Sequence, residues 1–184
     1  MRAVRSGAVA AALVAALGGC GGGAKKVEIR APSAAPTVHL SSSAFRDGAT
    51  MPKRFTCAGA GTPPPLAWSG VPRRAAELVL VLEDPDAPGG TFTHWTVFGV
   101  PPGTSQIRAG GLPAGASSGR NGYGKNGYGA PCPPSGDRAH RYVFTLYALS
   151  RRSGLAAGAS PAEVKDAVSA TAAARGRLTT TYRR

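Results

Sequence analysis

Acidic residues are scarce in this sequence. Its 184 residues include nine Asp and Glu against 22 Lys and Arg, which gives a formal net charge of +13. Such an excess could serve a nucleic-acid partner. The basic residues are dispersed, however, and no nucleic-acid-binding module is recognisable. We therefore predict no nucleic-acid partner, and the positive charge fits either a generally basic proteome or attraction to anionic polymers of a cell envelope.

Charged residues of both signs are also few, at 17% of the chain, whereas 42% of the residues are hydrophobic. This composition excludes a disordered chain, which is highly charged and poor in apolar residues. The 26 Gly and 16 Pro break helices and argue against a helical bundle or a coiled coil. The length suits a single domain.

Motifs for catalysis and nucleotide binding are missing or incomplete. There is no GxSxG. Gly122, Gly124 and Gly127 have the GxGxxG spacing, but prolines follow them where a dinucleotide site needs a helix. A P-loop would need Ser or Thr after Lys125, and Asn126 stands there. We predict no enzymatic activity and no cofactor, with a weak hydrolase as a minor alternative.

A metal site is a further minor alternative. Asp84, Asp86, His94 and His140 could in principle form a carboxylate–imidazole site, but the chain has no CxxC or HxxxH pair. Cys132 is flanked by prolines, and nothing in the sequence assigns His140 as its base. We predict no metal and no catalytic residue.

The N-terminus resembles the signal peptide of bacterial lipoproteins. Arg2 and Arg5 form a basic start, and residues 8–17 are uncharged and apolar but too short to span a bilayer. Small residues then precede Cys20, as in a lipobox, whose cysteine is acylated and becomes the new N-terminus. We expect a signal peptide over residues 1–19, lipidation of Cys20, and a membrane-anchored lipoprotein on the periplasmic or extracytoplasmic face of the cell envelope.

Residues 20–38 are rich in Gly, Ala and Pro, and we expect a flexible tether there. One domain then covers residues 39–184. Apolar runs within it predict strands at residues 78–82, 95–100 and 141–149. The first of these, LVLVL, is typical of a strand buried on both faces.

The end of the domain predicts one amphipathic helix. Ser160 is its N-cap, Pro161 its first residue, and Glu163 completes a capping box. We expect Gly176 to end the helix and residues 177–182 to form a final strand. Strands joined by long loops, followed by one helix, indicate a β-sandwich with a helix at one edge.

Polar side chains flank the apolar strands in two stretches. DPDAP at residues 84–88 follows one strand, and THW at 93–95 starts the next. GYGAPCPP at 127–134 and HRY at 140–142 form the second stretch. Polar groups that converge on strand ends above a rigid sandwich are typical of small-ligand sites.

These stretches resemble the phosphatidylethanolamine-binding protein family, and its bacterial Raf-kinase-inhibitor-like branch in particular. FTCAGAGTPPPLAW, DPDAP, HW, GKNGYGAPCPPSGD and HRYVFTLYAL occur in the family's order, from about Leu40 to Tyr182. The resemblance implies a mostly β fold, namely a Greek-key antiparallel β-sandwich with a C-terminal amphipathic helix and few short helices. It also implies a small pocket for phosphate-bearing or similar anions, such as a phospholipid headgroup.

Carried over by position, the resemblance assigns seven ligand-binding residues: Asp84, Asp86, His94, Tyr128, Cys132, His140 and Tyr142. Imidazoles and phenols can donate hydrogen bonds to phosphate oxygens, and the backbone around Cys132 can approach an anion. The aspartates fit as acceptors that orient the histidines, or as partners of a cationic amine.

Several alternatives stay open at this point. The main rival to a binding protein is an interaction module that inhibits a kinase or a protease. Cys57 and Cys132 can form a disulfide in an oxidising compartment, or they can be free thiols that line the pocket. The sequence also leaves open a homodimer, and it does not say which membrane carries the anchor.

Overall fold

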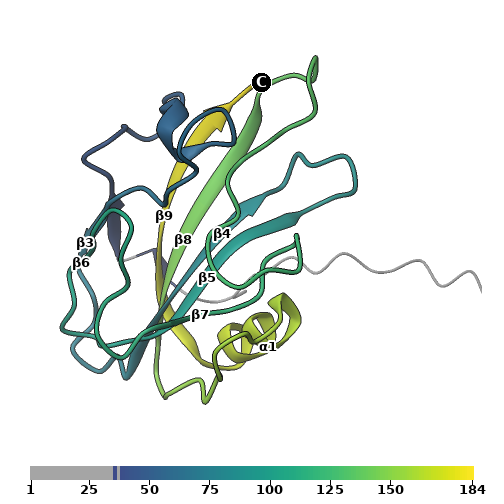
Figure 1. The fold of residues 1–184 in the computed structure, drawn as a ribbon. Helices are drawn as coiled ribbons and strands as arrows, with labels where there is room; N and C mark the ends of the chain where they lie inside the picture. The colour runs from purple at the N-terminus through teal and green to yellow at the C-terminus, as the bar shows by residue number, and fades with distance from the viewer. Residues whose placement is uncertain (1–34, 37) are drawn as a thin grey trace, which may run out of the picture.

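A computed structural model describes residues 35, 36 and 38–184, which form two sheets and one α-helix (Figure 1). The larger sheet has the strand order β1-β9-β8-β4-β5-β7, and the smaller sheet has the order β2-β3-β6. The elements are β1 (Ala35–Pro36), β2 (His39–Ser41), the 3₁₀ helix η1 (Lys53–Phe55), β3 (Leu66–Ser69), β4 (Glu77–Asp84), β5 (Phe92–Val100), β6 (Gln106–Ile107), β7 (Ser117–Ser118), β8 (His140–Leu149), α1 (Pro161–Thr171) and β9 (Ala172–Tyr182).

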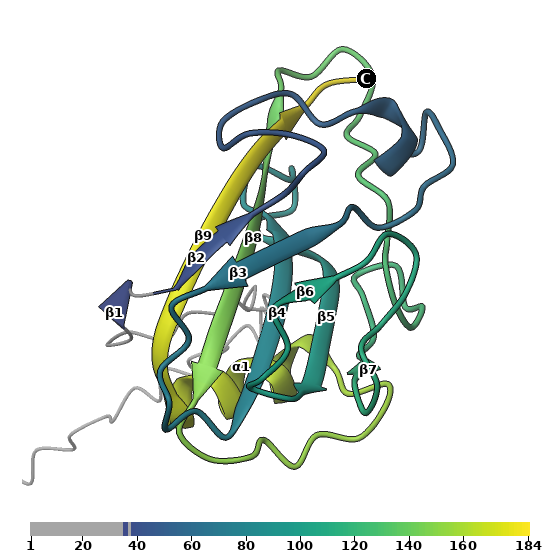
Figure 2. The ribbon, with the colours of Figure 1, turned by 90° about the vertical axis from the view of Figure 1, so that its left-hand side faces the viewer.

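The two sheets pack face to face as a sandwich (Figure 2). Strands pair in antiparallel fashion, except that β1 runs parallel to β9. After the β4–β5 hairpin the chain passes through the small sheet as β6 and returns to the large sheet as β7 beside β5. It then crosses to β8 on the other side of β4, which is the crossover of a Greek key. The predicted mostly β sandwich with a C-terminal helix is confirmed.

Strand β4 lies at the centre of the large sheet and is buried along its whole length. Leu78, Leu80 and Leu82 face the core between the sheets. Val79 and Val81 face the opposite side, where they pack with Val164 and Val168 of α1. The prediction of a strand buried on both faces is therefore confirmed, and the helix is what covers the second face.

The start of α1 also follows the prediction, but its end does not. The Ser160 side chain accepts a hydrogen bond from the Glu163 backbone, and the Glu163 side chain accepts one from the Ser160 backbone. The helix stops at Thr171, five residues before Gly176, and β9 begins at Ala172 instead of Arg177. From Ala172 onward the backbone N–H and C=O groups form hydrogen bonds with β8, starting at Leu149. This pairing overrides the helix propensity of the three alanines at 172–174.

Gly176 has a different role from the predicted helix stop. A Cβ atom at this position would lie 2.2 Å from the carbonyl oxygen of Val38, so only glycine allows the two backbones to approach. Val38 is buried and its N–H bonds to the Arg175 carbonyl. Because Ala35 and Pro36 already pair with β9, the predicted tether over residues 20–38 extends too far, and the folded domain begins before His39.

The predicted signal peptide, the lipidation site Cys20 and residues 20–34 of the predicted tether lie outside the described residues. Within residues 35, 36 and 38–184, no helix is both long and apolar enough to cross a membrane.

Candidate anion-binding site

A small cavity opens at the end of the sandwich where β4 ends and β8 begins. Its volume is about 180 Å³, which is below the range typical of drug-sized ligands and fits a small headgroup or an inorganic anion. Polar and aromatic side chains line it together with a proline-rich loop: Asp84, Ala87, Pro88, Phe92, His94, Tyr123, Cys132, Pro133, Pro134, His140 and Tyr142.

Strand alternation directs three of these side chains into the cavity. Asp84 is the last residue of β4 and continues the inward-facing series of Leu80 and Leu82. On β8, His140 and Tyr142 lead the inward-facing row that continues as the core residue Phe144. The polar groups therefore extend the apolar core toward solvent at one end of the sheet.

His94 reaches the cavity because β5 is irregular at this residue. Leu82 pairs with Trp95 and the next residue, Glu83, pairs with Thr93, so His94 is the extra residue of a β-bulge. In a regular strand His94 and Trp95 would face opposite sides of the sheet. The bulge lets Trp95 fill the core while the adjacent His94 lines the cavity.

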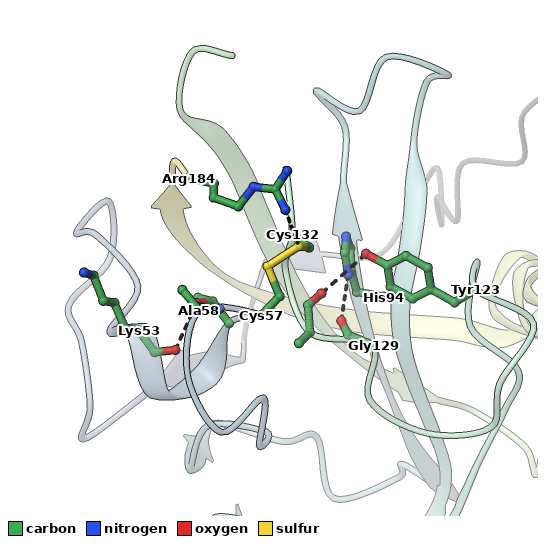
Figure 3. Close-up of a disulfide and its surroundings, with 10 residues drawn as sticks. Lys53, Cys57, Ala58, His94, Tyr123, Gly129, Cys132 and Arg184 are labelled. Atoms are coloured by element: carbon green, nitrogen blue, oxygen red, sulfur yellow. Dashed lines mark hydrogen bonds between the residues drawn. A yellow bond between two sulfur atoms is a disulfide. The ribbon is translucent and has the colours of Figure 1, made fainter. Parts of the chain in front are cut away.

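Each cavity histidine forms a hydrogen bond within the protein through its Nδ1 atom. His94 Nδ1 lies 2.7 Å from the Gly129 carbonyl oxygen (Figure 3), and His140 Nδ1 lies 2.8 Å from Asp84 Oδ2. Because carbonyl and carboxylate oxygens only accept, both Nδ1 atoms carry the proton. In a neutral ring Nε2 is then a bare acceptor, and it becomes a donor only when the ring gains a second proton.

Charges around the histidines act in opposite directions. Burial lowers the pKa of His94, opposed by its bond to the Gly129 carbonyl and by the Asp84 carboxylate. His140 Nε2 lies 3.4 Å from Asp137 Oδ2, a carboxylate that is partly exposed at the cavity mouth. His140 thus lies between two carboxylates, the buried Asp84 and the partly exposed Asp137.

The two predicted aspartates do different things. Asp84 uses one carboxylate oxygen to accept the Asp86 N–H at 2.8 Å, which closes an Asx-turn, while its other oxygen orients His140. Asp86 does not line the cavity. It forms a bidentate pair with the Arg141 guanidinium, with both N···O distances at 2.9 Å. This pair is the main reason why the pKa of Asp86 is lowered to about 2.

The structure brings Tyr142 into the cavity and places Tyr128 elsewhere. The Tyr142 hydroxyl is buried without a well-formed hydrogen bond to any described residue, and burial together with the Asp84 carboxylate raises the pKa of this phenol. Tyr128 instead donates to the Phe55 carbonyl at 2.6 Å and packs edge-on against Trp95. Its hydroxyl therefore ties η1 to the core and is absent from the cavity lining.

Tyr123 and Phe92 line the cavity and were not among the residues predicted from the sequence. The Tyr123 ring packs against Phe92 with centroids 4.7 Å apart and lies 5.8 Å from the ring of His94. Tyr123 and Tyr128 both follow an Asn-Gly pair in the repeated NGYG segment. That repeat was the one available signal, and only the path of the loop decides which tyrosine faces the cavity.

A disulfide between Cys57 and Cys132 supports the cavity wall (Figure 3). Of the two alternatives, the structure has the disulfide and not the free thiols. The Cys57 N–H also bonds to the Pro131 carbonyl, which fastens the two segments together beside the bridge. Arg184 Nη1 lies 3.4 Å from Cys132 Sγ, so a cation covers the solvent side of the sulfur. Among the described residues, no cluster of three His, Cys, Asp or Glu side chains could hold a metal ion.

Comparison with known proteins identifies the class of this fold and cavity. Residues 41–183 match the family described as phosphatidylethanolamine-binding protein. The chain belongs to this family, as the sequence motifs predicted.

Particular relatives place it more closely. The chain is 43% identical over 185 residues to the Mycobacterium tuberculosis protein named "Putative lipoprotein LppC", and the match covers 93% of this chain and 92% of the relative. Among solved structures, it is similar to the phosphatidylethanolamine-binding protein homologue CT736 of Chlamydia trachomatis, with 37% identity, a TM-score of 0.75, and coverage of 82% of this chain and 99% of the other. Escherichia coli YbcL gives 31% identity, a TM-score of 0.77, and coverage of 80% and 99%.

Proposed function

We propose that this protein is a non-enzymatic binding protein whose cavity takes a phosphate-type anion, and that an acylated Cys20 holds it at the membrane. The observation that carries the first part is the arrangement of His94 and His140. Both rings are buried at the cavity and both have Nδ1 engaged by a protein acceptor. Nε2 is therefore the ring atom that each histidine can turn to a ligand, and that of His140 also lies 3.4 Å from Asp137 Oδ2.

This arrangement couples anion binding to proton uptake. A neutral His94 or His140 offers the anion a lone pair at Nε2, which repels it, whereas the imidazolium offers a charge-assisted N–H donor. The Tyr142 phenol, kept protonated by its raised pKa, is a donor at any ordinary pH. The bound anion therefore favours the protonated form of both rings, and affinity increases as pH falls.

The cavity lining also supports a binding role over catalysis. It contains no Ser, Thr or Lys side chain, and its one cysteine is in the disulfide. A covalent mechanism in which His140 activates a Ser, Thr or Cys nucleophile would need one of these groups free within reach of the ring.

The first test is calorimetric titration with sulfate, which avoids the second ionisation of phosphate near pH 6. We expect wild-type affinity to increase as pH falls toward the pKa of the free histidines, and to level off below it because the rings are then already protonated before the anion binds. Since one charge-assisted hydrogen bond contributes about 1.5–3 kcal/mol, His140→Ala should weaken binding roughly ten- to a hundredfold.

The matched control is His39→Ala, because His39 is exposed on β2 and does not line the cavity. This variant should bind as the wild type does. Equal affinities for His140→Ala and the wild type, or a wild-type affinity that does not depend on pH, would place the anion elsewhere.

The anchor rests on different observations. The motif around Cys20 resembles a lipobox, and a relative that carries the name lipoprotein aligns with 93% of this chain. Expressed in a bacterium with its full N-terminus, the protein should have a mature chain that begins at a diacylated or triacylated Cys20. Intact-mass spectrometry decides this, with Cys20→Ser as the control. Cleavage at another residue, or an unmodified Cys20, would refute the anchor.

A further inference from the structure

The two sulfurs of the Cys57–Cys132 disulfide differ in how easily an incoming group can reach them. Cys57 is exposed, as are residues 58–60 that follow it, whereas Cys132 is half-buried between two buried prolines. The Arg184 side chain also reaches the Cys132 sulfur, with Nη1 at 3.4 Å (Figure 3). A group from solution therefore reaches the bridge more easily at Cys57 than at Cys132.

The backbone around Cys57 holds this residue at the surface. The Cys57 N–H donates to the Pro131 carbonyl at 3.0 Å, and the Gly59 N–H donates to the Thr56 carbonyl at 3.1 Å. A Cβ atom at residue 59 would lie 2.4 Å from the Lys53 carbonyl oxygen, so the loop folds back tightly on η1. Thr56, the residue before Cys57, is buried and anchors the loop. The exposure of Cys57 is therefore a property of the folded loop and does not require the chain to open.

The guanidinium of Arg184 also changes the chemistry of the Cys132 sulfur. Arg184 forms no ion pair with an acidic residue in the part of the chain that the structure describes. A disulfide sulfur is a weak acceptor, whereas a thiolate carries a full charge, so the contact becomes much stronger when the bridge opens. Asp84, the one carboxylate in the cavity lining, is already bonded to a histidine and to a backbone N–H. The guanidinium therefore stabilises a thiolate at Cys132.

These two differences favour one direction of thiol–disulfide exchange. The rate of exchange depends on which sulfur can be reached and on how stable the leaving thiolate is. Cys57 is the sulfur within reach, and Cys132 would leave as a thiolate beside Arg184. We propose that this bridge is a thiol-exchange site for a dithiol partner, in which Cys57 is the sulfur attacked and Cys132 is the sulfur that leaves.

The exchange takes two steps. The partner's thiolate bonds to Cys57 Sγ, the bond between the two cysteine sulfurs breaks, and its electron pair stays on Cys132 as a thiolate. The partner's second thiol then attacks the mixed disulfide, so the partner is oxidised to a disulfide, and the two cysteines gain two electrons and the two protons of the partner's thiols. In reverse, the Cys132 thiolate attacks Cys57 of the mixed disulfide, releases the partner and closes the bridge, which is the direction that an oxidising compartment favours.

The first measurement locates the sulfur that is attacked. In the full chain with Cys20→Ser, the two remaining cysteines are those of the bridge. This protein is treated under native conditions with 2-mercaptoethanol, a neutral monothiol, and free thiols are blocked early with N-ethylmaleimide. Peptide mass spectrometry should find mercaptoethanol on Cys57 and maleimide on Cys132 at least about fivefold more often than the reverse. An even distribution, or an adduct mainly on Cys132, would overturn the proposal.

The second measurement gives the contribution of Arg184. In the same chain, Arg184→Gln should slow formation of the Cys57 adduct about threefold, because a unit charge beside the leaving thiolate contributes about fivefold in water and the transition state carries part of that charge. The matched control is Arg183→Gln, which removes the same charge from an exposed side chain that bonds to neither sulfur. This control should keep the wild-type rate, and Arg184→Lys should keep most of it. Equal rates for the two glutamine variants would overturn the role of the guanidinium.

The dependence on thiol concentration shows whether the folded protein reacts. Attack on an exposed sulfur of the native chain should make the rate increase in proportion to the concentration of 2-mercaptoethanol. A rate that reaches a plateau would mean that the bridge reacts only after the chain opens, and it would overturn the proposal. Neither step of the exchange needs a bound anion or an acylated Cys20, so failure of the proposed anion site or of the anchor would leave these outcomes unchanged.

Discussion

Replacing Cys57 and Cys132 with serine should lower the free energy of unfolding by about 4 kcal/mol. The bridge closes a loop of 75 residues, and the chain-entropy model gives this value for a loop of that length. The loss is a large share of the 5–15 kcal/mol that stabilises a typical domain. Urea unfolding monitored by tryptophan fluorescence measures it, since Trp68 and Trp95 are both buried.

The control is the wild-type protein unfolded in the presence of a reductant, which should match the double variant. Cys132 also lines the cavity, so the variant should bind sulfate more weakly because only the backbone bond to Pro131 then holds the proline-rich wall to residue 57. A loss of stability below about 1 kcal/mol would contradict the prediction, because it would mean that the unfolded chain is not restrained by the bridge.

Asp84→Asn should reduce the pH dependence of anion binding and increase affinity at alkaline pH. In the wild type, Asp84 holds the proton of neutral His140 on Nδ1, so Nε2 can donate only after protonation. In the variant, the oxygen of the introduced amide would keep the bond from the Asp86 N–H, and the NH₂ group would then face His140 as a donor. The neutral ring should respond by moving its proton to Nε2, where it can bind the anion directly.

The expected effect is large because each proton taken up changes affinity about tenfold per pH unit above the free-state pKa. Asp84→Asn should lose the proton uptake that His140 contributes to anion binding and keep the proton uptake of His94. Its sulfate affinity near pH 8 should therefore exceed that of the wild type by about tenfold or more. Calorimetry across a pH series gives the slope of the logarithm of affinity against pH for each protein, and the pH at which the two affinities are equal.

Asp137→Asn separates the effect of charge from that of the tautomer. It removes the same charge, 3.4 Å from Nε2, without touching the Nδ1 bond. This control should bind sulfate more tightly at every pH while keeping the wild-type slope. If Asp84→Asn also keeps that slope, His140 is not the group that takes up the proton.

The elements that the sequence predicted well are those in which local pattern and tertiary environment agree. The five-residue apolar run ending at Leu82 is buried on both faces, and the capping box at Ser160 starts the helix. The end of that helix was wrong because nothing local indicates that β8 has ten residues to pair. The partner strand, and not Gly176, decides where the helix stops.

The candidate site shows the same division. The histidines and Asp84 were identified because their motifs are short and contiguous. The β-bulge at His94 was not predictable, since it depends on how two strands register and leaves no mark on composition. Tyr123 was missed for a related reason, since the two NGYG copies are locally alike. Only the fold places Tyr123 at the cavity and Tyr128 against the Phe55 carbonyl of η1.

The position of β9 has a consequence for the order in which the chain can fold during synthesis. This strand, formed by residues 172–182, lies between β1 and β8 in the large sheet, and the loop around Gly48 and Met51 bonds to it. The earliest and latest parts of the domain therefore meet in adjacent strands. A nascent chain that lacks residues 173–184 has no partner for β1 and leaves one edge of β8 unpaired. The large sheet therefore closes only after β9 has been synthesised.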